Sequence, residues 1–215
     1  MKVEVSGADC TLAADIHRVF SAKPHSQHIA SKFALAHLAA ILRTHKIESV
    51  LEIGAGIGTM TYLLLSMLPD SAAVECTEDN EICLSSLDAN LPREMRSRLI
   101  IHRHAHLVAG AFDLVVIDGA VNGVTASVFK AGSVCFAEGK RTKERRTIQQ
   151  RLKECQMACA FTNYLPWRLE FTRRRIGWRP LRSRLKAWLG IEKPLPAITW
   201  RKGCWIGRVE KIQTL

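Results

Sequence analysis

The sequence predicts an α/β fold in which helices cover both faces of a doubly wound sheet. Short apolar strand segments alternate with helical segments between residues 49 and 158, which is typical of a parallel sheet. The segment 112–119 is apolar almost throughout, as expected for a strand that is covered on both faces. The segment 49–58 runs from an apolar strand into three glycines at alternate positions, and a helical pattern follows.

Two helices are predicted before the first strand. Residues 8–21 carry apolar side chains at helical spacing, and the segment 23–27, which contains Pro24, interrupts the pattern. The second helix is predicted near 27–44.

The central region is predicted to alternate strands and helices. Strands are expected at 49–54, 72–77, 98–103, 112–119 and 132–139. Helices are expected at 59–68, 79–90, around 123–130 and at 142–158. Two final strands, 197–200 and 204–209, are joined by "RKG" and would form an antiparallel C-terminal hairpin. The result is a seven-stranded, mostly parallel sheet.

Composition restricts the class of protein. A length of 215 residues with 47% hydrophobic residues fits one folded domain. No stretch approaches the roughly 20 apolar residues of a transmembrane helix, and the N-terminal residues lack the apolar segment of a secretory signal. We therefore expect a cytoplasmic protein whose seven scattered cysteines are free thiols.

The charge of the chain is unevenly distributed. Residues 1–138 hold 11 basic and 15 acidic side chains, whereas residues 139–215 hold 20 basic and 5 acidic ones. This asymmetry indicates an anionic partner or surface that the C-terminal third would contact.

The glycine-rich turn predicts a ligand site. Gly54, Gly56 and Gly58 allow the backbone to turn sharply and to approach a ligand closely. Dinucleotides require the spacing G-x-G-x-x-G, and an acid such as Glu52 beside the turn repels pyrophosphate. Glu52 instead suits a cation, such as the ammonium and sulfonium groups of S-adenosylmethionine. Glu75, about twenty residues further on, is placed to accept hydrogen bonds from ribose hydroxyls.

Three segments resemble motifs of the class I S-adenosylmethionine-dependent methyltransferases. They are "VLEIGAGIGT" at 50–59, "AVECTEDN" at 73–80 and "FDLVVIDGA" at 112–120. The resemblance covers roughly residues 27–160 and implies a Rossmann-like sheet with S-adenosylmethionine as the cofactor. It places the methionine end of the cofactor beside Glu52, Gly54, Ala55, Gly56 and Gly58. It places the ribose beside Glu75 and the adenine beside Cys76, His104 and Ala105.

This resemblance divides the single predicted domain, 1–215, into four parts. They are the N-terminal helices 1–46, the cofactor-binding core 47–160, a basic cover segment 161–196 and the closing hairpin 197–215.

Asp118 and Glu138 are the predicted catalytic residues. Each ends a predicted strand and precedes a glycine. Two carboxylates at neighbouring strand ends either share a hard divalent cation or divide into a base and an orienting group. In the catechol O-methyltransferase-like group, strand four ends in a metal-binding Asp, which Asp118 resembles, and strand five ends in Asp-Asn. Because Gly139 offers no side-chain oxygen, we assign no metal ligand and keep a divalent metal as the alternative.

Three histidines at alternate positions offer a second set of candidates. On an extended chain His102, His104 and His106 would share one face, which suits either a metal site or a single general base.

The basic cover segment leaves three functions open. We expect methyl transfer to an oxygen of a small-molecule, anionic or glycan-like acceptor. "RRRIGWR" at 173–179 combines arginines with aromatic groups and is equally typical of RNA binding, which would make the acceptor an RNA. Residues 180–190 predict a basic amphipathic helix that either docks on its own domain or lies on an anionic membrane surface. In the latter case the chain would be a non-catalytic, cofactor-binding scaffold at a membrane or on a partner.

Overall fold

A computed structural model describes residues 3–139, 141–161, 165–166 and 203–212. Its helices are α1 (Gly7–Ser21), α2 (Lys32–Thr44), α3 (Thr59–Met67), α4 (Glu81–Asn90), α5 (Arg93–Arg96) and α6 (Thr142–Glu154), with single 3-10 turns η1 (Ser26–His28), η2 (Ala105–Leu107) and η3 (Ala126–Val128). Its strands are β1 (Ser49–Ile53), β2 (Ala73–Thr77), β3 (Leu99–His102), β4 (Phe112–Ile117), β5 (Phe129–Glu138), β6 (Met157–Phe161), β7 (Leu165–Pro166) and β8 (Gly203–Lys211).

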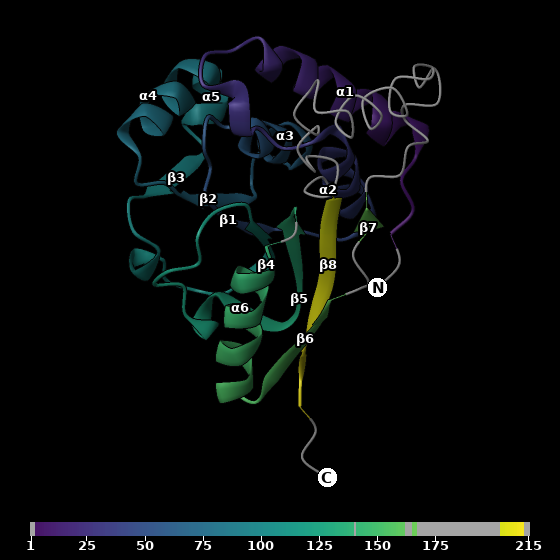
Figure 1. The fold of residues 1–215 in the computed structure, drawn as a ribbon, viewed down its shortest axis with the longest axis vertical. Coiled ribbons are helices and arrows are strands. Elements are labelled where there is room, and N and C mark those ends of the chain that lie inside the picture. The colour runs from purple at the N-terminus through teal and green to yellow at the C-terminus, as the bar shows by residue number, and fades with distance from the viewer. Residues whose placement is uncertain (1–2, 140, 162–164, 167–202, 213–215) are drawn as a thin grey trace, which may run out of the picture.

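The strands form one mixed sheet, which confirms the predicted fold class. The order along the sheet is β3-β2-β1-β4-β5-β8-β6, and the two-residue strand β7 also pairs with β8. Strands β1 to β5 are parallel, whereas β8 runs antiparallel between β5 and β6. In Figure 1 the chain can be followed from β1 outwards through β2 to β3, and then back to β4 on the other side of β1. The direction of winding therefore reverses between β1 and β4.

Helices cover both faces of this sheet because side chains alternate along each strand. Val50 of β1 packs with α1, α2 and α3 on one face. Leu51 and Ile53 of the same strand pack on the other face, with Ile148 and Leu152 of α6. Each fully buried aliphatic side chain of this kind contributes about 1.5–3 kcal/mol to folding. The two clusters hold the carboxyl ends of β1 and β4 in fixed positions.

Two predicted helices differ from the structure. The predicted helix 142–158 is wrong at its C-terminal end, since α6 stops at Glu154 and the chain turns through Gln156 (φ +55°) into β6. The apolar segment of β6 pairs with β8, and this long-range pairing outweighs the local helical pattern. The predicted helix 123–130 is only the 3-10 turn η3, because β5 already begins at Phe129.

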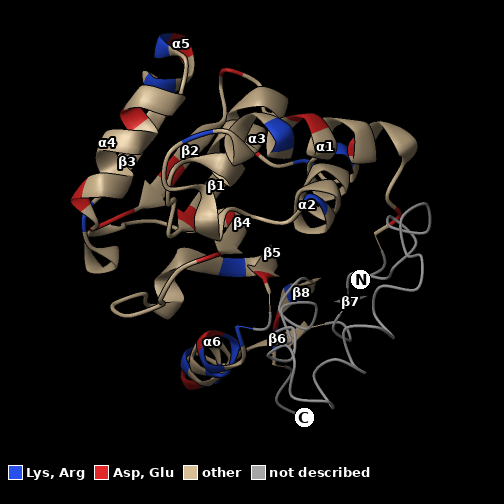
Figure 2. Cartoon of the chain, turned by 45° about the horizontal axis from the view of Figure 1, so that its top comes forward, with Lys and Arg blue, Asp and Glu red and all other residues tan. Residues whose placement is uncertain are grey.

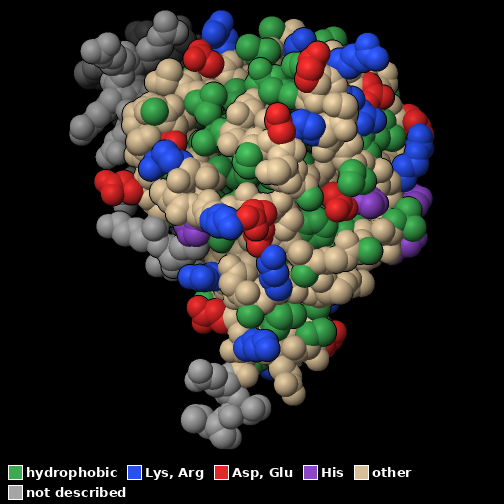
Figure 3. Space-filling view, turned by 180° about the vertical axis from the view of Figure 1, so that it is seen from behind, with side chains coloured by type: hydrophobic (Ala, Val, Ile, Leu, Met, Phe, Trp, Pro, Cys, Tyr) green, Lys and Arg blue, Asp and Glu red, His purple; other side chains and the backbone are tan. Residues whose placement is uncertain are grey.

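The predicted strand 197–200 and most of the basic cover segment lie outside the described residues. Residues 167–202 hold 11 of the chain's basic side chains and 2 of its acidic ones. The described part is more evenly charged. Basic side chains outnumber acidic ones on α6 (Figure 2), but both signs are interspersed over the face in Figure 3. Within the described ranges, no helix is long and apolar enough to cross a membrane.

An ion pair between the buried Asp9 and the partly exposed Arg43 joins α1 to α2. The Oδ2 atom of Asp9 accepts hydrogen bonds from the backbone and hydroxyl of Ser6, the N-cap of α1, and from Arg43 Nη2 of α2 at 2.9 Å. Burial raises the pKa of Asp9, but the hydrogen bonds from Arg43 and Ser6 outweigh burial and lower this pKa to about 2. Asp9 therefore ties the N-terminal helix to the rest of the fold in its charged form.

We predict that Asp9→Asn lowers the free energy of unfolding at pH 7 by about 1–3 kcal/mol, because hydrogen bonds to a charged group are lost. The pKa of an aspartate in an unfolded chain is about 3.9. The contribution of Asp9 is therefore fully present above that value and disappears as the pH falls towards 2. Urea denaturation from pH 7 down to the lowest pH at which both proteins fold measures the difference.

Asp15→Asn is the matched control, since Asp15 pairs with Arg18 on the exposed surface of the same helix. Equal destabilisation by the two substitutions, or a difference that does not shrink on acidification, would contradict the role assigned to Asp9.

Candidate functional site

The site is built where β1 and β4 end beside each other. Gly54, Gly56 and Gly58 all have left-handed φ values, of +86°, +55° and +94°. A Cβ atom added to Gly54 would lie 2.6 Å from the Cα atom of Gly119, so the turns after β1 and β4 touch through their backbones. The backbone N–H groups of Gly54 and Ala55 also donate to the carbonyl of Thr77, each at 3.1 Å. These contacts fix the glycine turn against the ends of β4 and β2.

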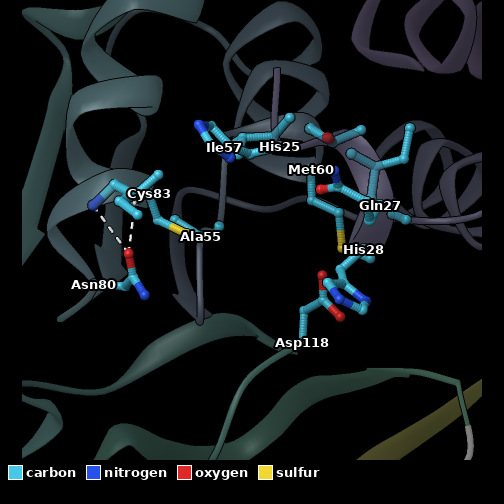
Figure 4. A pocket seen from close by; sticks show the side chains of 14 residues that line it. His25, Gln27, His28, Ala55, Ile57, Met60, Asn80, Cys83 and Asp118 are labelled. Atoms are coloured by element: carbon cyan, nitrogen blue, oxygen red, sulfur yellow. Dashed lines mark hydrogen bonds between the residues drawn. The ribbon is translucent and has the colours of Figure 1, made fainter. Parts of the chain in front are cut away.

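Two cavities meet at this turn. The first, of about 270 Å³, lies between η1 and the beginnings of α3 and α4, and Figure 4 shows its side chains. The second, of about 550 Å³, lies above the ends of the strands and is the more polar one. Gly56, His28 and Asp118 line both cavities, so the two pockets adjoin at these residues. The reversal of winding between β1 and β4 lies directly below, where α/β sheets commonly bind ligands.

The carboxylate at the end of β2 is Glu78, which is a correction to the placement of Glu75. β2 continues to Thr77, and Glu78 follows at the mouth of the second pocket. Glu78 accepts hydrogen bonds from the backbone N–H groups of Gly56 at 2.7 Å, Asp79 at 3.1 Å and Asn80 at 3.0 Å. The predicted strand 72–77 already ended at Thr77, so the sequence itself marked Glu78 as the first carboxylate beyond it.

Glu75 and Cys76 lie within β2 and line neither pocket. Glu75 accepts a hydrogen bond from Nε2 of His102 on β3, at 2.6 Å. Cys76 is fully buried in the cluster that contains α1, α2 and α3. Both residues precede the end of the strand and lie away from the two pockets, and their contact with the cofactor stays a prediction.

Glu52 is buried below the glycine turn rather than exposed in either pocket. It is 1% exposed, and its Oε2 atom accepts a hydrogen bond from Thr61 of α3 at 2.6 Å. Its Oε1 atom has no hydrogen-bond partner among the described residues. Burial raises the pKa of Glu52 well above its usual value, and the nearby Asp118 and Glu78 raise it further. Strand alternation turns Glu52 towards α3, so the predicted direct contact with a ligand cation is corrected.

Asp118 lies where the two pockets meet and forms an ion pair with Arg141. Arg141 Nη2 donates to Asp118 Oδ1 at 2.8 Å and also to the carbonyl oxygen of the same residue. Burial raises the pKa of Asp118 to about 6, against the opposing effect of Arg141 and with a smaller contribution from Glu78. The predicted position of Asp118 in the crevice is therefore confirmed, whereas its catalytic role stays a prediction.

Glu138 ends β5 but lines neither pocket. Its backbone pairs with Cys204 of β8, and its charge contributes to the raised pKa of that thiol. The predicted pairing of Asp118 and Glu138 around one ligand is not observed, because Arg141 occupies the place beside Asp118.

His104 and Ala105 line the second pocket, as the prediction for the adenine end requires. The rings of His104 and His106 stack at 5.4 Å between centroids, whereas His102 is bound to Glu75. The three histidines therefore do not share one face. Among the residues that the structure describes, no group of three or more His, Cys, Asp or Glu side chains is arranged to hold a metal ion.

Sequence reasoning missed three residues of the site, namely His28, Glu78 and Arg141. His28 comes from η1, whose approach to Asp118 depends on how α2 packs. Arg141 comes from the beginning of α6, on the far side of β5 in sequence. No local sequence pattern predicts that His28 or Arg141 lies at the site.

Several solved structures share this architecture. An O-methyltransferase from Bacillus cereus in complex with S-adenosylhomocysteine superimposes with a TM-score of 0.55 at 12% identity, and the match covers 95% of this chain and 92% of that one. The O-methyltransferase TomG from Streptomyces achromogenes, in complex with S-adenosylmethionine, superimposes with a TM-score of 0.52 at 15% identity, covering 98% and 92%. The chain has the class I methyltransferase fold. No protein-family model matches the sequence, and neither does any curated protein.

The contact between the two turns gives a direct test of the site's construction. We predict that Gly119→Ala lowers the free energy of unfolding by about 1–3 kcal/mol, because the new Cβ atom would lie 2.8 Å from the Cα atom of Gly54. Urea denaturation measures the loss. Gly7→Ala is the control, since nothing lies within 4 Å of its Cβ position. A Gly119→Ala protein as stable as the wild type would show that the turns separate at no cost.

Proposed function

We propose that the chain is an S-adenosylmethionine-dependent methyltransferase that methylates an oxygen of a small-molecule or glycan-like acceptor. The observation that carries this proposal is Glu78, a carboxylate fixed by the N–H group of Gly56 at the edge of a pocket lined by the glycine turn. The cofactor-bound structures from Bacillus cereus and Streptomyces achromogenes, which share the fold, support the same cofactor.

The residues present fit this cofactor. Glu78 accepts two backbone hydrogen bonds at Oε1 and one at Oε2, which leaves a lone pair of Oε2 to accept from a ribose hydroxyl. Nothing lies within 4 Å of a Cβ position on Gly56, so a ligand has room to approach that backbone. The hydroxyl of Thr59 is buried at the edge of the first pocket and has no partner among the described residues. A polar ligand group there would satisfy it.

The charges around the turn favour a cationic ligand over a dinucleotide. Asp118 and Glu78 lie close enough to Glu52 to raise its pKa, and Glu78 also raises the pKa of Asp118. Carboxylates in this arrangement repel a pyrophosphate and attract an ammonium or sulfonium group. Because Glu52 is buried below the turn, the carboxylates that border the pockets are Glu78 and Asp118.

Asp118 is the residue proposed to act at the reacting end. When bound, S-adenosylmethionine supplies a methyl group that is activated by its positive sulfur. The chain's part is to hold the acceptor oxygen in line with that group, and such positioning supplies much of the acceleration in a displacement of this kind. Asp118 stands where the two pockets meet, and the exposed imidazole of His28 faces it from η1 in Figure 4.

We predict that Glu78→Ala weakens binding of S-adenosylhomocysteine by about ten- to a hundredfold, since hydrogen bonds to a charged acceptor are worth about 1.5–3 kcal/mol. Isothermal titration measures the affinity, with NAD as the competing ligand class. Glu75→Ala is the matched control and should bind like the wild type, because Glu75 lies within β2.

Two outcomes would overturn this assignment. If Glu75→Ala loses binding of S-adenosylhomocysteine and Glu78→Ala does not, the ribose would be assigned to Glu75. Binding of NAD alone, or of neither ligand, would refute the methyltransferase.

A further inference from the structure

Arg141 lines the second pocket and lies beside Asp118. Of the two arginines that line this pocket in the described part of the chain, Arg103 is paired with Glu81. Arg141 is paired with Asp118, and the side chains of the pair are 31% and 18% exposed. Within the described ranges, Arg141 donates only from Nη2, which leaves its Nε and Nη1 atoms without protein partners. The N–H groups on the Nε and Nη1 atoms of such a guanidinium can bind a further anionic oxygen.

The fold holds Arg141 in this position. Arg141 is the residue before α6 and adopts a left-handed conformation, with φ +32° and ψ +40°. Conformations of this kind cost about 1–3 kcal/mol in residues other than glycine and persist where the surroundings enforce them. Further along α6, Arg145 stacks on Trp205 of β8 at 3.4 Å from the ring centroid, and Arg151 donates to the carbonyls of Val121 and Val124. These contacts anchor the helix that presents Arg141.

A divalent cation does not fit the residues at this place. The arrangement expected for one would use Asp118 together with oxygen ligands at the end of β5. Instead, Oδ1 of Asp118 already accepts from a guanidinium, Gly139 supplies no side-chain oxygen, and Glu138 does not line the pocket. The described side chains also include no set of three metal-ligating groups.

We propose that Arg141 takes the place of a divalent metal and binds the acceptor oxygen, so that the acceptor is an oxygen acid that enters the site already ionised, such as an acidic phenol or a carboxylic acid. This inference rests on the proposed function. It goes beyond it in naming the ionic state of the acceptor and the residue that recognises it.

The reaction then needs no base in the transfer step. A lone pair of the ionised acceptor oxygen forms the new O–CH₃ bond, while the pair of the breaking S–CH₃ bond remains on sulfur. The negative charge of the acceptor and the positive charge of the sulfonium cancel, and no proton changes place. Asp118 is therefore a positioning residue that orients Arg141, which binds the acceptor.

The probe for this proposal is 4-nitrocatechol, whose absorbance reports whether it is ionised. It is titrated with pH in the presence of protein saturated with S-adenosylhomocysteine. We expect the wild-type protein to lower the apparent pKa of the dye by about one unit, the shift typical of a neighbouring opposite charge. Arg141→Met should abolish the shift, and Arg141→Lys should retain part of it, since lysine keeps the charge but not the fork.

Arg146→Met is the matched control, because Arg146 is exposed on the same helix and lines neither pocket. It should leave the shift unchanged. No shift in the wild-type protein, whether the dye stays protonated or does not bind, overturns the proposal. So does a shift that survives in Arg141→Met.

Manganese binding tests the competing explanation. Electron paramagnetic resonance should show no stoichiometric Mn²⁺ on the protein loaded with S-adenosylhomocysteine. A single bound Mn²⁺ that disappears in Asp118→Asn would assign the site to a metal and overturn the proposal. Binding of S-adenosylhomocysteine is measured first for every variant, before the dye or the metal is added. A protein that does not bind it contradicts the proposed function, so the two failures are distinguished.

Discussion

The backbone contact between Gly54 and Gly119 is the constraint on which the site depends. It exists because β1 and β4 are neighbours in register, with Ile53 beside Ile117, and because neither turn carries a Cβ atom at the point of contact. The N–H group of Asp118 continues the ladder by donating to the carbonyl of Ile53 at 3.0 Å. Asp118 is thereby held directly beside the glycine turn. A side chain on either glycine would push the two strand ends apart.

The alternation of side chains along the strands determines which carboxylates border the pockets and which are buried under the glycine turn. Glu52 is turned towards α3, where it is covered, whereas Glu78 and Asp118 lie beyond the ends of their strands and reach the pockets. The carboxylates still interact, since Asp118 and Glu78 raise the pKa of Glu52 and Glu78 raises the pKa of Asp118. The result is a strongly acidic turn beneath the ligand, with Arg141 as the counter-charge on the side of β5. A site that is acidic on one side and basic on the other can bind a cationic methyl donor next to an anionic methyl acceptor.

The C-terminal strand β8 helps to hold α6, and with it Arg141, in position. It lies between β5 and β6 and carries Trp205, on which Arg145 of α6 stacks. Gly207 of β8 leaves room for the thiol of Cys159, since a Cβ atom there would lie 2.6 Å from that sulfur. Close packing of β8 therefore fixes α6, and α6 begins next to Arg141. A residue of the candidate acceptor site thus depends on pairing between segments more than forty positions apart.

The sequence by itself determined the fold class, the glycine turn and the position of Asp118. These features are encoded locally, in strand length, in glycines that permit a left-handed backbone and in a carboxylate that directly follows an apolar strand. The sequence placed Glu52, Glu75 and Cys76 at the ligand, because motif spacing does not say on which face of a strand a side chain lies. It also extended the helix of α6 into the beginning of β6. Only the tertiary structure decided that Glu78 borders the pocket and that Arg141 reaches Asp118, since both depend on contacts between elements that are far apart in the chain.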